Sequence, residues 1–503
     1  MTMSLTQTSP NAHAIVQIQQ LMETSGVRFG TSGARGLATA LTAELCFAYT
    51  TAFLQVVAAP SGSRVALGMD LRPSSPNIAA ACIAAITQAG LQADYCAILP
   101  TPALALHAQE QGIPAIMITG SHIPFDRNGI KFYRSEGEIT KADEVAIANA
   151  SVMLPNGIGL NPLPVANGQA RQHYIDRYLD FFPRTALAGM RLGFYEHSSV
   201  ARDLLHDILT GLGATVISLG RTDQFVPIDT EAVAEADIEQ ARLWATEYGF
   251  DAILSTDGDA DRPLLGDEHG DYLRGDVVGI LCAQYLNADA VATPVSSNTA
   301  LEKCAAFAQI QRTRIGSPFV IEGMESLLAN GARHVVGFEA NGGFLVGSPL
   351  EKLSANRSRT LSALPTRDAV LPIVALLAMA RERGVKVSQL PAQLPARFTG
   401  SDRIKNFATE KSHTLLQDLA RSPAALHAFL TSLNLETGLA LNPAVASIDQ
   451  TDGLRITLTN LEIVHLRPSG NAPELRCYAE AESQERANAL ARGCLQNITA
   501  LYG

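Results

Sequence analysis

The chain has 503 residues, 47% of them hydrophobic and 17% charged, so it is long enough for several domains and has an ordinary globular composition. Its net charge of −11 argues against wholesale nucleic-acid binding, so an anionic substrate would need a local basic site. The seven cysteines are scattered and form no CxxC pair, which fits a reducing compartment and argues against a disulfide framework.

The N-terminal sequence carries no targeting signal of the secretory type. The first 27 residues contain no Lys or Arg and no long apolar run, so we expect no signal peptide. The strongest apolar run, residues 369–380, is shorter than the roughly 20 residues of a membrane span and predicts a buried helix. We therefore expect a cytoplasmic protein without a membrane partner.

A glycine-rich loop, RFGTSGARG, spans residues 28–36. Its two arginines, Arg28 and Arg35, suit phosphate binding. The loop lacks the Gly-Lys-Ser/Thr ending of a P-loop, so a nucleotide site is not expected there.

One pattern occurs three times: an apolar strand, a Ser-Ser turn, a helix and a further apolar segment. The serine pairs are Ser74-Ser75, Ser198-Ser199 and Ser296-Ser297. Serine before an amphipathic run is an N-cap signal, and the third helix should extend through Phe307. Strand–helix–strand units imply parallel sheets, so the pattern predicts three related α/β domains, although such units can also look alike by chance.

A serine loop, TGSHIPFDRNGIKF, follows the buried strand predicted at residues 115–118. Ser121 leaves the strand abruptly, where a nucleophile is easily presented, and His122 and Lys131 are candidates for proton transfer or phosphate contact. The loop is not the Gly-x-Ser-x-Gly elbow of an esterase. Taken alone it is a weak signal, because a lone histidine in a loop often serves only as a hydrogen-bonding group.

The sequence DGDADR, residues 257–262, is the most specific motif in the chain. Asp257, Asp259 and Asp261 follow a predicted buried strand at alternate positions, so their oxygens can converge on one hard cation, with Arg262 available for a phosphate. A polar turn is the alternative, since Asp and Gly are common turn residues. An EF-hand is a poor match, because no glutamate closes a twelve-residue ligand loop.

A third polar loop, GFEANGGF, occupies residues 337–344. Glu339 and Asn341 alternate and can face one ligand, and carboxylate and amide groups suit sugar hydroxyls. The glycines allow close approach of the backbone, although a plain Asn-Gly turn explains the sequence equally well.

The C-terminal part reads differently. Residues 445–458 predict a hairpin with an Asp-Gly turn, further strands follow at 462–466 and 474–480, and a helix is expected from 484 to 501. The loop between the last strands, RPSGNAPELR, starts at Arg467 and can form an anion cradle from backbone N–H groups, or simply a polar hairpin loop. The predicted domains are residues 1–167, 168–270, 271–393 and 394–503.

In chain order, these five motifs resemble those of the α-D-phosphohexomutase family, and the resemblance covers nearly the whole chain. It implies four domains: three related α/β units with mixed, mostly parallel sheets, and a C-terminal α+β domain with an antiparallel sheet. It also implies an isomerase that transfers a phosphoryl group between O1 and O6 of a hexose phosphate, with hexose 1,6-bisphosphate as intermediate and activator.

The resemblance further implies a role for each motif. Ser121 would be the phosphoserine, and its oxygen would share Mg²⁺ with the three carboxylates of Asp257, Asp259 and Asp261. Lys131 and Arg35 would lie near the reacting phosphate, and Arg262 would lie beside the metal loop as a substrate-binding group. His122 would be a further catalytic residue. Sugar recognition would fall to Glu339 and Asn341, and the distal phosphate to Arg467, Ser469, Gly470 and Asn471.

Some positions depart from the family pattern. Many relatives carry a histidine in the sugar loop where Gly343 and Phe344 stand, and the loop at residues 314–317 lacks another. The serine loop has Gly120 and Ile123, where Ala and Asn are frequent. The general acid/base is therefore open, with Lys131 and His122 as candidates.

The segments at residues 195–199 and 337–343 look most like those of the bacterial phosphomannomutases of the family, and this resemblance favours mannose phosphate as the substrate. Glucose phosphate, or both sugars, is the alternative, and glucosamine phosphate is a more distant one. A sugar phosphatase would need no second phosphate site, which argues against simple hydrolysis. Either a monomer or a homodimer is compatible with the sequence.

Overall fold

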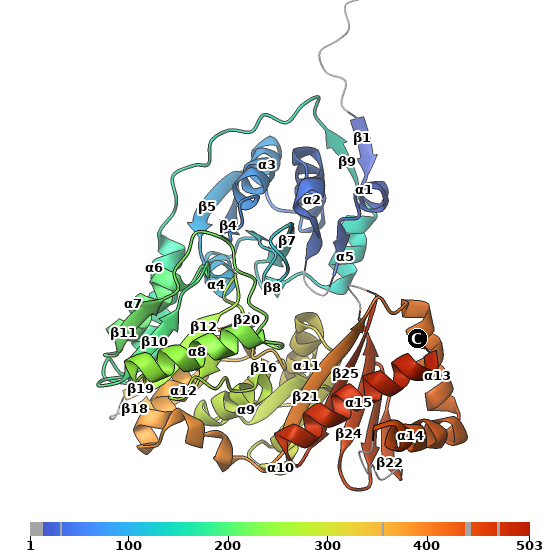
Figure 1. The fold of residues 1–503 in the computed structure, drawn as a ribbon. Coiled ribbons are helices and arrows are strands. Elements are labelled where there is room, and N and C mark those ends of the chain that lie inside the picture. The colour runs from blue at the N-terminus through green and yellow to red at the C-terminus, as the bar shows by residue number, and fades with distance from the viewer. Residues whose placement is uncertain (1–13, 31–32, 355–356, 438–443, 470–472, 503) are drawn as a thin grey trace, which may run out of the picture.

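The computed structural model describes residues 14–30, 33–354, 357–437, 444–469 and 473–502. Three α/β units are followed along the chain by a C-terminal α+β unit, with the second and fourth units on opposite sides of the third (Figure 1). The predicted fold class is confirmed, while the boundaries between the units stay a prediction.

The first unit is built around a mixed sheet of order β2-β3-β7-β6-β4-β5, with β8 paired to β7. In this sheet β4 runs parallel to β5 and β6, and β7 runs antiparallel to β6 and β3. The strands are β2 (Arg28–Phe29), β3 (Ala34–Leu37), β4 (Arg64–Met69), β5 (Gln92–Ile98), β6 (Ala115–Ile118), β7 (Arg127–Arg134) and β8 (Gly137–Glu138). The helices are α1 (Ile18–Ser25), α2 (Ala43–Val56), α3 (Ser75–Gln88), α4 (Thr101–Gln111) and α5 (Lys141–Ala148), with a 3₁₀ turn η1 (Ala38–Ala40).

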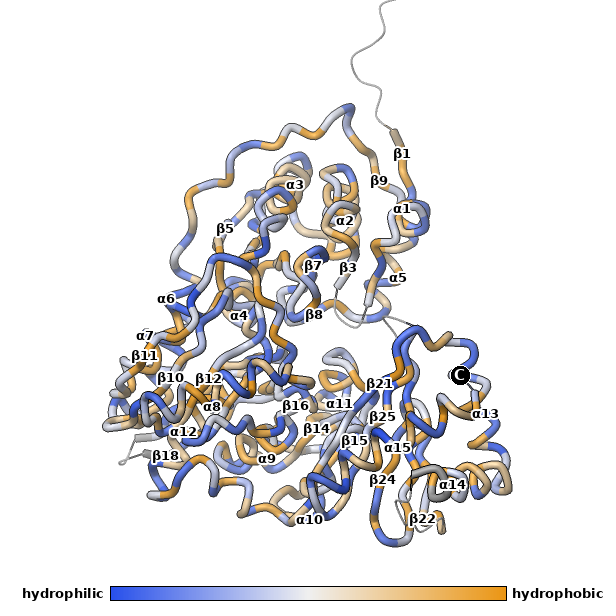
Figure 2. The backbone as a smooth tube through the Cα atoms, in the orientation of Figure 1, coloured by the Kyte–Doolittle hydropathy of each residue, from blue (hydrophilic) through white to orange (hydrophobic). Residues whose placement is uncertain are grey.

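A long strap connects the first unit to the second. It starts after a two-stranded ribbon, β1 (Ala14–Gln17) and β9 (Ser151–Leu154), and ends at α6 (Gln169–Phe181). Figure 1 shows the strap running along the outside of the first unit, and Figure 2 shows that polar and apolar residues alternate along it.

The second unit has a sheet of order β11-β10-β12-β13. Its strands are β10 (Arg191–Tyr195), β11 (Thr215–Leu219), β12 (Ala252–Thr256) and β13 (Pro263–Gly266), and its remaining helices are α7 (Arg202–Gly211) and α8 (Glu235–Tyr248). Every residue of β12 is buried, as its apolar sequence predicted. Because β13 pairs antiparallel with β12, the aspartate motif is the connection between these two strands.

The third unit has a sheet of order β15-β14-β16-β17-β20. Its strands are β14 (Ala290–Pro294), β15 (Gln309–Thr313), β16 (Val335–Phe338), β17 (Phe344–Val346) and β20 (Leu364–Asp368), with a side ribbon of β18 (Leu350–Ser354) and β19 (Arg357–Leu361). The helices are α9 (Gly275–Tyr285), α10 (Ala300–Lys303), α11 (Ser317–Ala329) and α12 (Val370–Arg383).

The fourth unit is an antiparallel sheet of order β21-β25-β24-β23-β22, reached through 3₁₀ turns η2 (Val387–Gln389) and η3 (Pro391–Gln393). Its strands are β21 (Phe398–Lys405), β22 (Val445–Asp449), β23 (Leu454–Leu458), β24 (Ile463–Pro468) and β25 (Glu474–Ala481). The helices are α13 (Thr409–Arg421), α14 (Pro423–Thr437) and α15 (Gln484–Tyr502). The predicted hairpin, later strands and last helix are confirmed.

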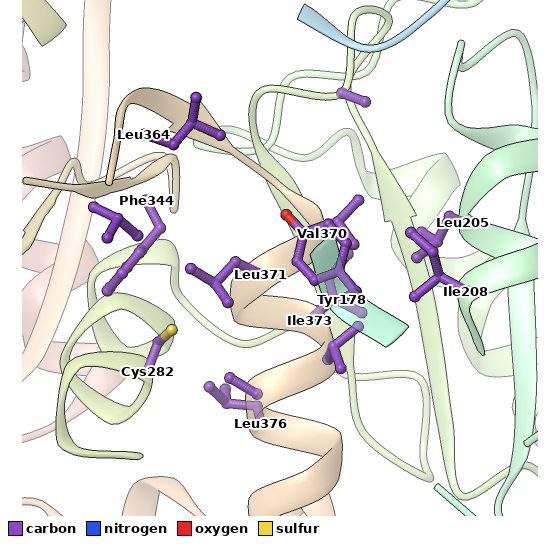
Figure 3. Packing of buried hydrophobic residues seen from close by; sticks show 14 of the residues in the cluster. Tyr178, Leu205, Ile208, Cys282, Phe344, Leu364, Val370, Leu371, Ile373 and Leu376 are labelled. Atoms are coloured by element: carbon purple, nitrogen blue, oxygen red, sulfur yellow. The ribbon is translucent and has the colours of Figure 1, made fainter. Parts of the chain in front are cut away.

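The largest hydrophobic core joins the first three units to one another, while the fourth unit has a core of its own. Helix α12 is buried from Val370 to Ala380, which confirms the buried helix predicted for this apolar run. Figure 3 shows α12 side chains such as Leu371 and Ile373 packed between α6 and α7 on one side and α9 and β17 on the other. The second and third units therefore share one core, which fixes the aspartate motif relative to the sugar loop.

Two local predictions are wrong. The third repeat helix stops at Lys303 instead of Phe307, because Ala305 adopts a left-handed φ of 53° and turns the chain toward β15. The serine pairs do not cap their helices. Instead, the second serine of each pair bonds to a polar side chain at the end of a strand. Ser75 and Ser297 bond to Asp70 and Thr293 at the end of the preceding strand, whereas Ser199 bonds to Thr256 at the end of β12, which comes later in the chain.

The seven cysteines all lie in the described part of the chain, and all are free thiols. Six are buried and Cys304 is partly exposed. The free thiols agree with the sequence, which argued against a disulfide framework. Among the helices that the structure describes, none is both long and apolar enough to cross a membrane.

Candidate active site

Two of the predicted motifs meet at the ends of β6 and β12. The Ser121 hydroxyl donates to Asp257 Oδ2 at 2.6 Å, although the two residues are 136 positions apart. Ser121 is fully buried and adopts a left-handed φ of 52°, which is uncommon for a residue with a side chain. Strained backbone of this kind is typical of functional sites, and it needs support from the surroundings.

That support comes from Arg72, which the sequence reading missed. Arg72 is buried and donates to the backbone carbonyls of Ser121 and of three further residues of the serine loop, Ile123, Pro124 and Arg127. It is itself held by Asp70 and lies 3.9 Å from the centre of the Phe225 ring. The sequence did offer a signal for this arginine, because Asp70 and Arg72 directly follow β4 and this strand is parallel to β6, which leads to Ser121.

Gly120 gives Arg72 its space. A Cβ atom at position 120 would lie 2.5 Å from the Arg72 guanidinium carbon. The departure from Ala at this position is therefore explained by the buried arginine beneath the loop.

The three aspartates form one buried cluster whose ligand oxygens all lie within 4.8 Å of one another. Asp257 Oδ1 accepts the backbone N–H groups of Asp261 and Arg262. Asp259 Oδ1 and Asp261 Oδ1 are buried without a hydrogen-bond partner among the described residues. Converging carboxylate oxygens with free lone pairs fit a hard divalent cation such as Mg²⁺, and they are costly to bury without one.

Lys131 is the counter-charge to this cluster. Its Nζ donates to Asp259 Oδ2 at 2.7 Å and to Asp261 Oδ2 at 2.8 Å. Burial lowers the pKa of Lys131, but these two carboxylates outweigh it and raise the pKa overall. These two contacts therefore favour the protonated ammonium form of Lys131.

The carboxylates differ in their electrostatics. Burial and the charges of Asp261 and Asp259 raise the pKa of Asp257 well above its usual range. Burial also disfavours charge on Asp261, but Arg367, Lys131 and Arg262 hold its pKa well below that range. The cluster therefore combines one carboxylate that resists ionisation with one that is firmly ionised.

Arg35, Arg262 and His122 complete the basic side of the site. Arg262 Nη1 lies 2.8 Å from His122 Nδ1, and because arginine only donates, this ring nitrogen accepts and the ring is neutral. Burial, Arg262 and Arg35 hold the pKa of His122 well below its usual range. Arg35 Nε is buried without a hydrogen-bond partner among the described residues, and burial together with Arg262 lowers the Arg35 pKa to about 10.

The sugar loop lies next to the aspartate cluster. Glu339 Oε2 accepts from Arg367 Nη1 at 2.9 Å, and the same guanidinium donates to Asp261 Oδ2 from Nε and Nη2. Asn341 Oδ1 accepts the Gly343 N–H, which orients the side chain and leaves its amide NH₂ group available to a ligand. Arg367 was also missed, although a polar Arg-Asp pair before an apolar helix was a visible signal.

The distal-phosphate loop forms a separate cluster in the fourth unit. Arg467 and Ser469 line a cavity of about 510 Å³ together with His413 and Gln417. Arg467 Nε donates to Asp452 Oδ2, which also accepts the backbone N–H of Ile315 in the third unit, each at 2.9 Å. The Asp452 contact was not foreseen. Gly470 and Asn471 lie outside the described residues.

Comparison with known proteins gives matches along most of the chain. Residues 26–152 match the family model for phosphoglucomutase/phosphomannomutase alpha/beta/alpha domain I. Residues 274–398 match the model for domain III of the same family, and residues 405–494 match its C-terminal domain.

Individual relatives agree with these matches. A phosphomannomutase of Salmonella muenchen is 48% identical over 97% of this chain and 99% of its own length. A phosphomannomutase of Sinorhizobium fredii is 45% identical over 92% of this chain and 97% of its own. The fold resembles a crystal structure of a phosphoglucomutase/phosphomannomutase family protein from Burkholderia thailandensis, with a TM-score of 0.70, 17% identity, and coverage of 93% of this chain and 97% of that one.

Proposed function

The chain belongs to the phosphoglucomutase/phosphomannomutase family and is a phosphohexomutase, and on that premise we propose that it interconverts mannose 6-phosphate and mannose 1-phosphate. The preference for mannose rests on the two phosphomannomutase relatives, since relatives named phosphoglucosamine mutase are only 27–31% identical. The observation that carries the chemistry is the Ser121 hydroxyl bonded to Asp257 inside the aspartate cluster.

In the proposed mechanism Ser121 carries the phosphoryl group. The phosphoryl group passes from Ser121 Oγ to the free hydroxyl of the bound hexose phosphate. The Ser–O–P bond breaks and a sugar O–P bond forms, the sugar hydroxyl loses its proton and Ser121 Oγ gains one, which gives free serine and a hexose 1,6-bisphosphate. The bisphosphate reorients, and its other phosphoryl group then returns to Ser121. A phosphoserine carries a charge of about −1.5 to −2, so the step requires strong electrostatic stabilisation.

The surrounding groups supply that stabilisation. Asp257, Asp259 and Asp261 would hold Mg²⁺, which when bound neutralises charge on the phosphoryl oxygens. Lys131 and Arg35 add fixed positive charge around the same oxygens. The geometry supports an electrostatic role for Lys131, because the two carboxylates hold its proton.

Substrate binding would use two further groups of residues. Glu339 and the Asn341 amide would meet the sugar hydroxyls, while Arg467, Ser469, Gly470 and Asn471 would hold the phosphate that is not reacting. Because Arg467 lies on a separate unit from Ser121, the fourth unit must approach the others during turnover, and such motions often limit the rate of well-evolved enzymes. A cytoplasmic location and a monomeric or dimeric state remain part of this proposal.

A parallel assay tests the proposal. Conversion of mannose 1-phosphate, glucose 1-phosphate and glucosamine 1-phosphate is measured by coupled enzymes, with hexose 1,6-bisphosphate as activator and released phosphate recorded in the same samples. We expect the highest kcat/KM for mannose 1-phosphate, and loss of activity when Mg²⁺ is removed with EDTA. An equal or higher value for another sugar would overturn the mannose preference, and phosphate release matching substrate loss would indicate a phosphatase.

A further inference from the structure

Arg367 occupies the position where the aspartate cluster meets the sugar loop. It lies near the C-terminal end of β20, and its side chain is only 3% exposed. Nε and Nη2 donate to Asp261 Oδ2 at 3.1 and 2.8 Å, and Nη1 donates to Glu339 Oε2 at 2.9 Å. One guanidinium thus binds a residue of the second unit and a residue of the sugar loop at the same time.

Each carboxylate keeps one oxygen for another partner. Asp261 Oδ1 is buried without a hydrogen-bond partner, and Glu339 Oε1 accepts no hydrogen bond from the residues that the structure describes. Arg367 therefore fixes one oxygen of each group. The second oxygen of Glu339 is left for the proposed sugar, and that of Asp261, which lies 3.6 Å from Arg262 Nε, is left for the proposed cation.

The backbone around Arg367 is fixed from both sides. The next residue, Asp368, accepts hydrogen bonds from Tyr174 and Tyr178 of α6 and from the N–H groups that start α12. The N–H of Ala369 donates to the carbonyl of Ala260 inside the aspartate motif. Consequently the guanidinium is held by a rigid frame that spans the shared core of the second and third units.

Gly343 is shaped to accept this arginine. A Cβ atom at position 343 would lie 2.6 Å from Arg367 Cδ and 2.8 Å from its Cγ. Any side chain there would displace the arginine, so the glycine and Arg367 form one steric unit.

We propose that Arg367 is a positioning residue that sets the spacing between the metal-binding carboxylates and the sugar-binding carboxylate. This proposal rests on the proposed mutase function and names a residue that sets the geometry of its active site. Arginine suits the task because its planar fork offers donors in fixed directions, whereas the lysine ammonium is a compact point charge that cannot reach two separate carboxylates in the same way.

A positioning role has a distinct kinetic signature. The phosphate contacts that bring substrate to the enzyme do not involve Arg367, so KM should change little when it is replaced. The sugar hydroxyl would no longer be aligned with the phosphoserine, and misplacement by about 1 Å can cost roughly a hundredfold in rate. The metal site should survive, because Lys131 still holds Asp261 and one neighbouring positive charge is removed.

Three variants and one control test this. Arg367→Met should lower kcat by about a hundredfold with KM within threefold of wild type. Arg367→Lys should recover part of that loss, and Gly343→Ala, which keeps the charge but displaces the side chain, should lower kcat as well. The control is Arg312→Met, which removes an arginine paired with Glu302 at the opposite edge of the same sheet. Mg²⁺ binding is measured for each protein by calorimetry on the dephosphorylated enzyme.

The outcomes separate the possibilities. The proposal holds if kcat falls in Arg367→Met and Gly343→Ala while Mg²⁺ affinity and the Arg312→Met control stay near wild type. It is overturned if kcat of Arg367→Met stays within threefold of wild type, or if Mg²⁺ binding and kcat are lost together. Should Arg367→Met fail to fold, Gly343→Ala and Arg367→Lys still decide the matter. A wild-type enzyme without mutase activity would instead reject the proposed function itself.

Discussion

Replacing Asp257 with Asn should abolish Mg²⁺ binding and, at the same time, stabilise the metal-free protein. Asp257 is buried, and burial with the charges of Asp261 and Asp259 raises its pKa well above the usual range, so its charge opposes folding when no cation is bound. The amide can reproduce its hydrogen bonds, because Oδ1 can still accept two backbone N–H groups and Nδ2 can donate to the Ser121 hydroxyl.

The magnitudes follow from the separations of the charges. Two like charges 4.8 Å apart, the upper limit within the cluster, repel by roughly 3.5 kcal/mol at an effective dielectric near 20. Arg262 offsets part of this repulsion, so the net gain in stability should be smaller. Losing one ligand charge about 4 Å from a doubly charged cation costs roughly 8 kcal/mol at the same dielectric, which is enough to abolish measurable Mg²⁺ binding.

Asp259→Asn is the matched control with the opposite expected sign. Asp259 Oδ2 accepts from both Lys131 and Thr101, and although burial disfavours its charge, these partners lower its pKa. Removing that charge should destabilise the metal-free protein, while Mg²⁺ affinity should fall as for Asp257→Asn.

Thermal unfolding in EDTA and in a Mg²⁺ series measures both effects. A ligand that binds only the folded state raises the midpoint with concentration, so wild type should shift upward and both variants should not. In EDTA the midpoint of Asp257→Asn should lie above wild type and that of Asp259→Asn below it. If the two variants shift in the same direction in EDTA, or if either retains the wild-type Mg²⁺ response, the electrostatic reasoning is refuted.

Three further predictions concern separate parts of the molecule. Peptide mass spectrometry should find phosphate on Ser121, and Ser121→Ala should lose activity by about a thousandfold or more; near wild-type turnover would reject the nucleophile. Arg467→Ala should lower kcat/KM by roughly tenfold to a hundredfold yet still accept phosphate at Ser121 from hexose bisphosphate, and complete loss of that phosphorylation with metal binding intact would place Arg467 in the chemical step. Burial lowers the pKa of His465 to about 4, so its ring stays neutral in the folded state while the unfolded chain takes up a proton below roughly pH 6.5. Stability should therefore fall by up to roughly 3 kcal/mol between pH 6.5 and 4, and urea unfolding of His465→Gln should show a flatter pH dependence than wild type.

Much of the fold was predictable because it depends on local sequence patterns. The apolar strands, the buried helix at residues 370–383 and the Asp-Gly hairpin near residue 452 are each set by neighbours in the sequence. The end of α10 could not be predicted in this way, because it depends on the left-handed backbone of Ala305, which turns the chain toward β15. The helix caps predicted at the serine pairs were wrong for a similar reason, because the serine hydroxyls bond to side chains at the ends of strands and not to the start of the helix.

The candidate site likewise contains residues that local motifs predicted and residues that they did not. The nucleophile loop and the aspartate motif have dense local signals, and the structure brings Ser121 and Asp257 into contact. Arg72 and Arg367 were missed because their partners lie far away in the sequence: Ser121 is 49 residues from Arg72, and Glu339 and Asp261 are 28 and 106 residues from Arg367. One arginine beside a strand looks like any other in sequence. Asp452 was read only as a turn residue, whereas it also binds Arg467 and the third unit.

The buried thiols give the molecule an internal set of reporters for partial opening. Reagents attack the thiolate, and burial raises the pKa of Cys82 and Cys96 to about 12, so both should stay silent until the first unit opens. Cys282 reports on the third unit, and Cys477 and Cys494 report on the fourth. Cys304 is partly exposed, so a thiol reagent should label it first. Residues 168–270 contain no cysteine. Labelling in mild urea, read peptide by peptide, would thus rank three of the four units by local stability without any introduced probe.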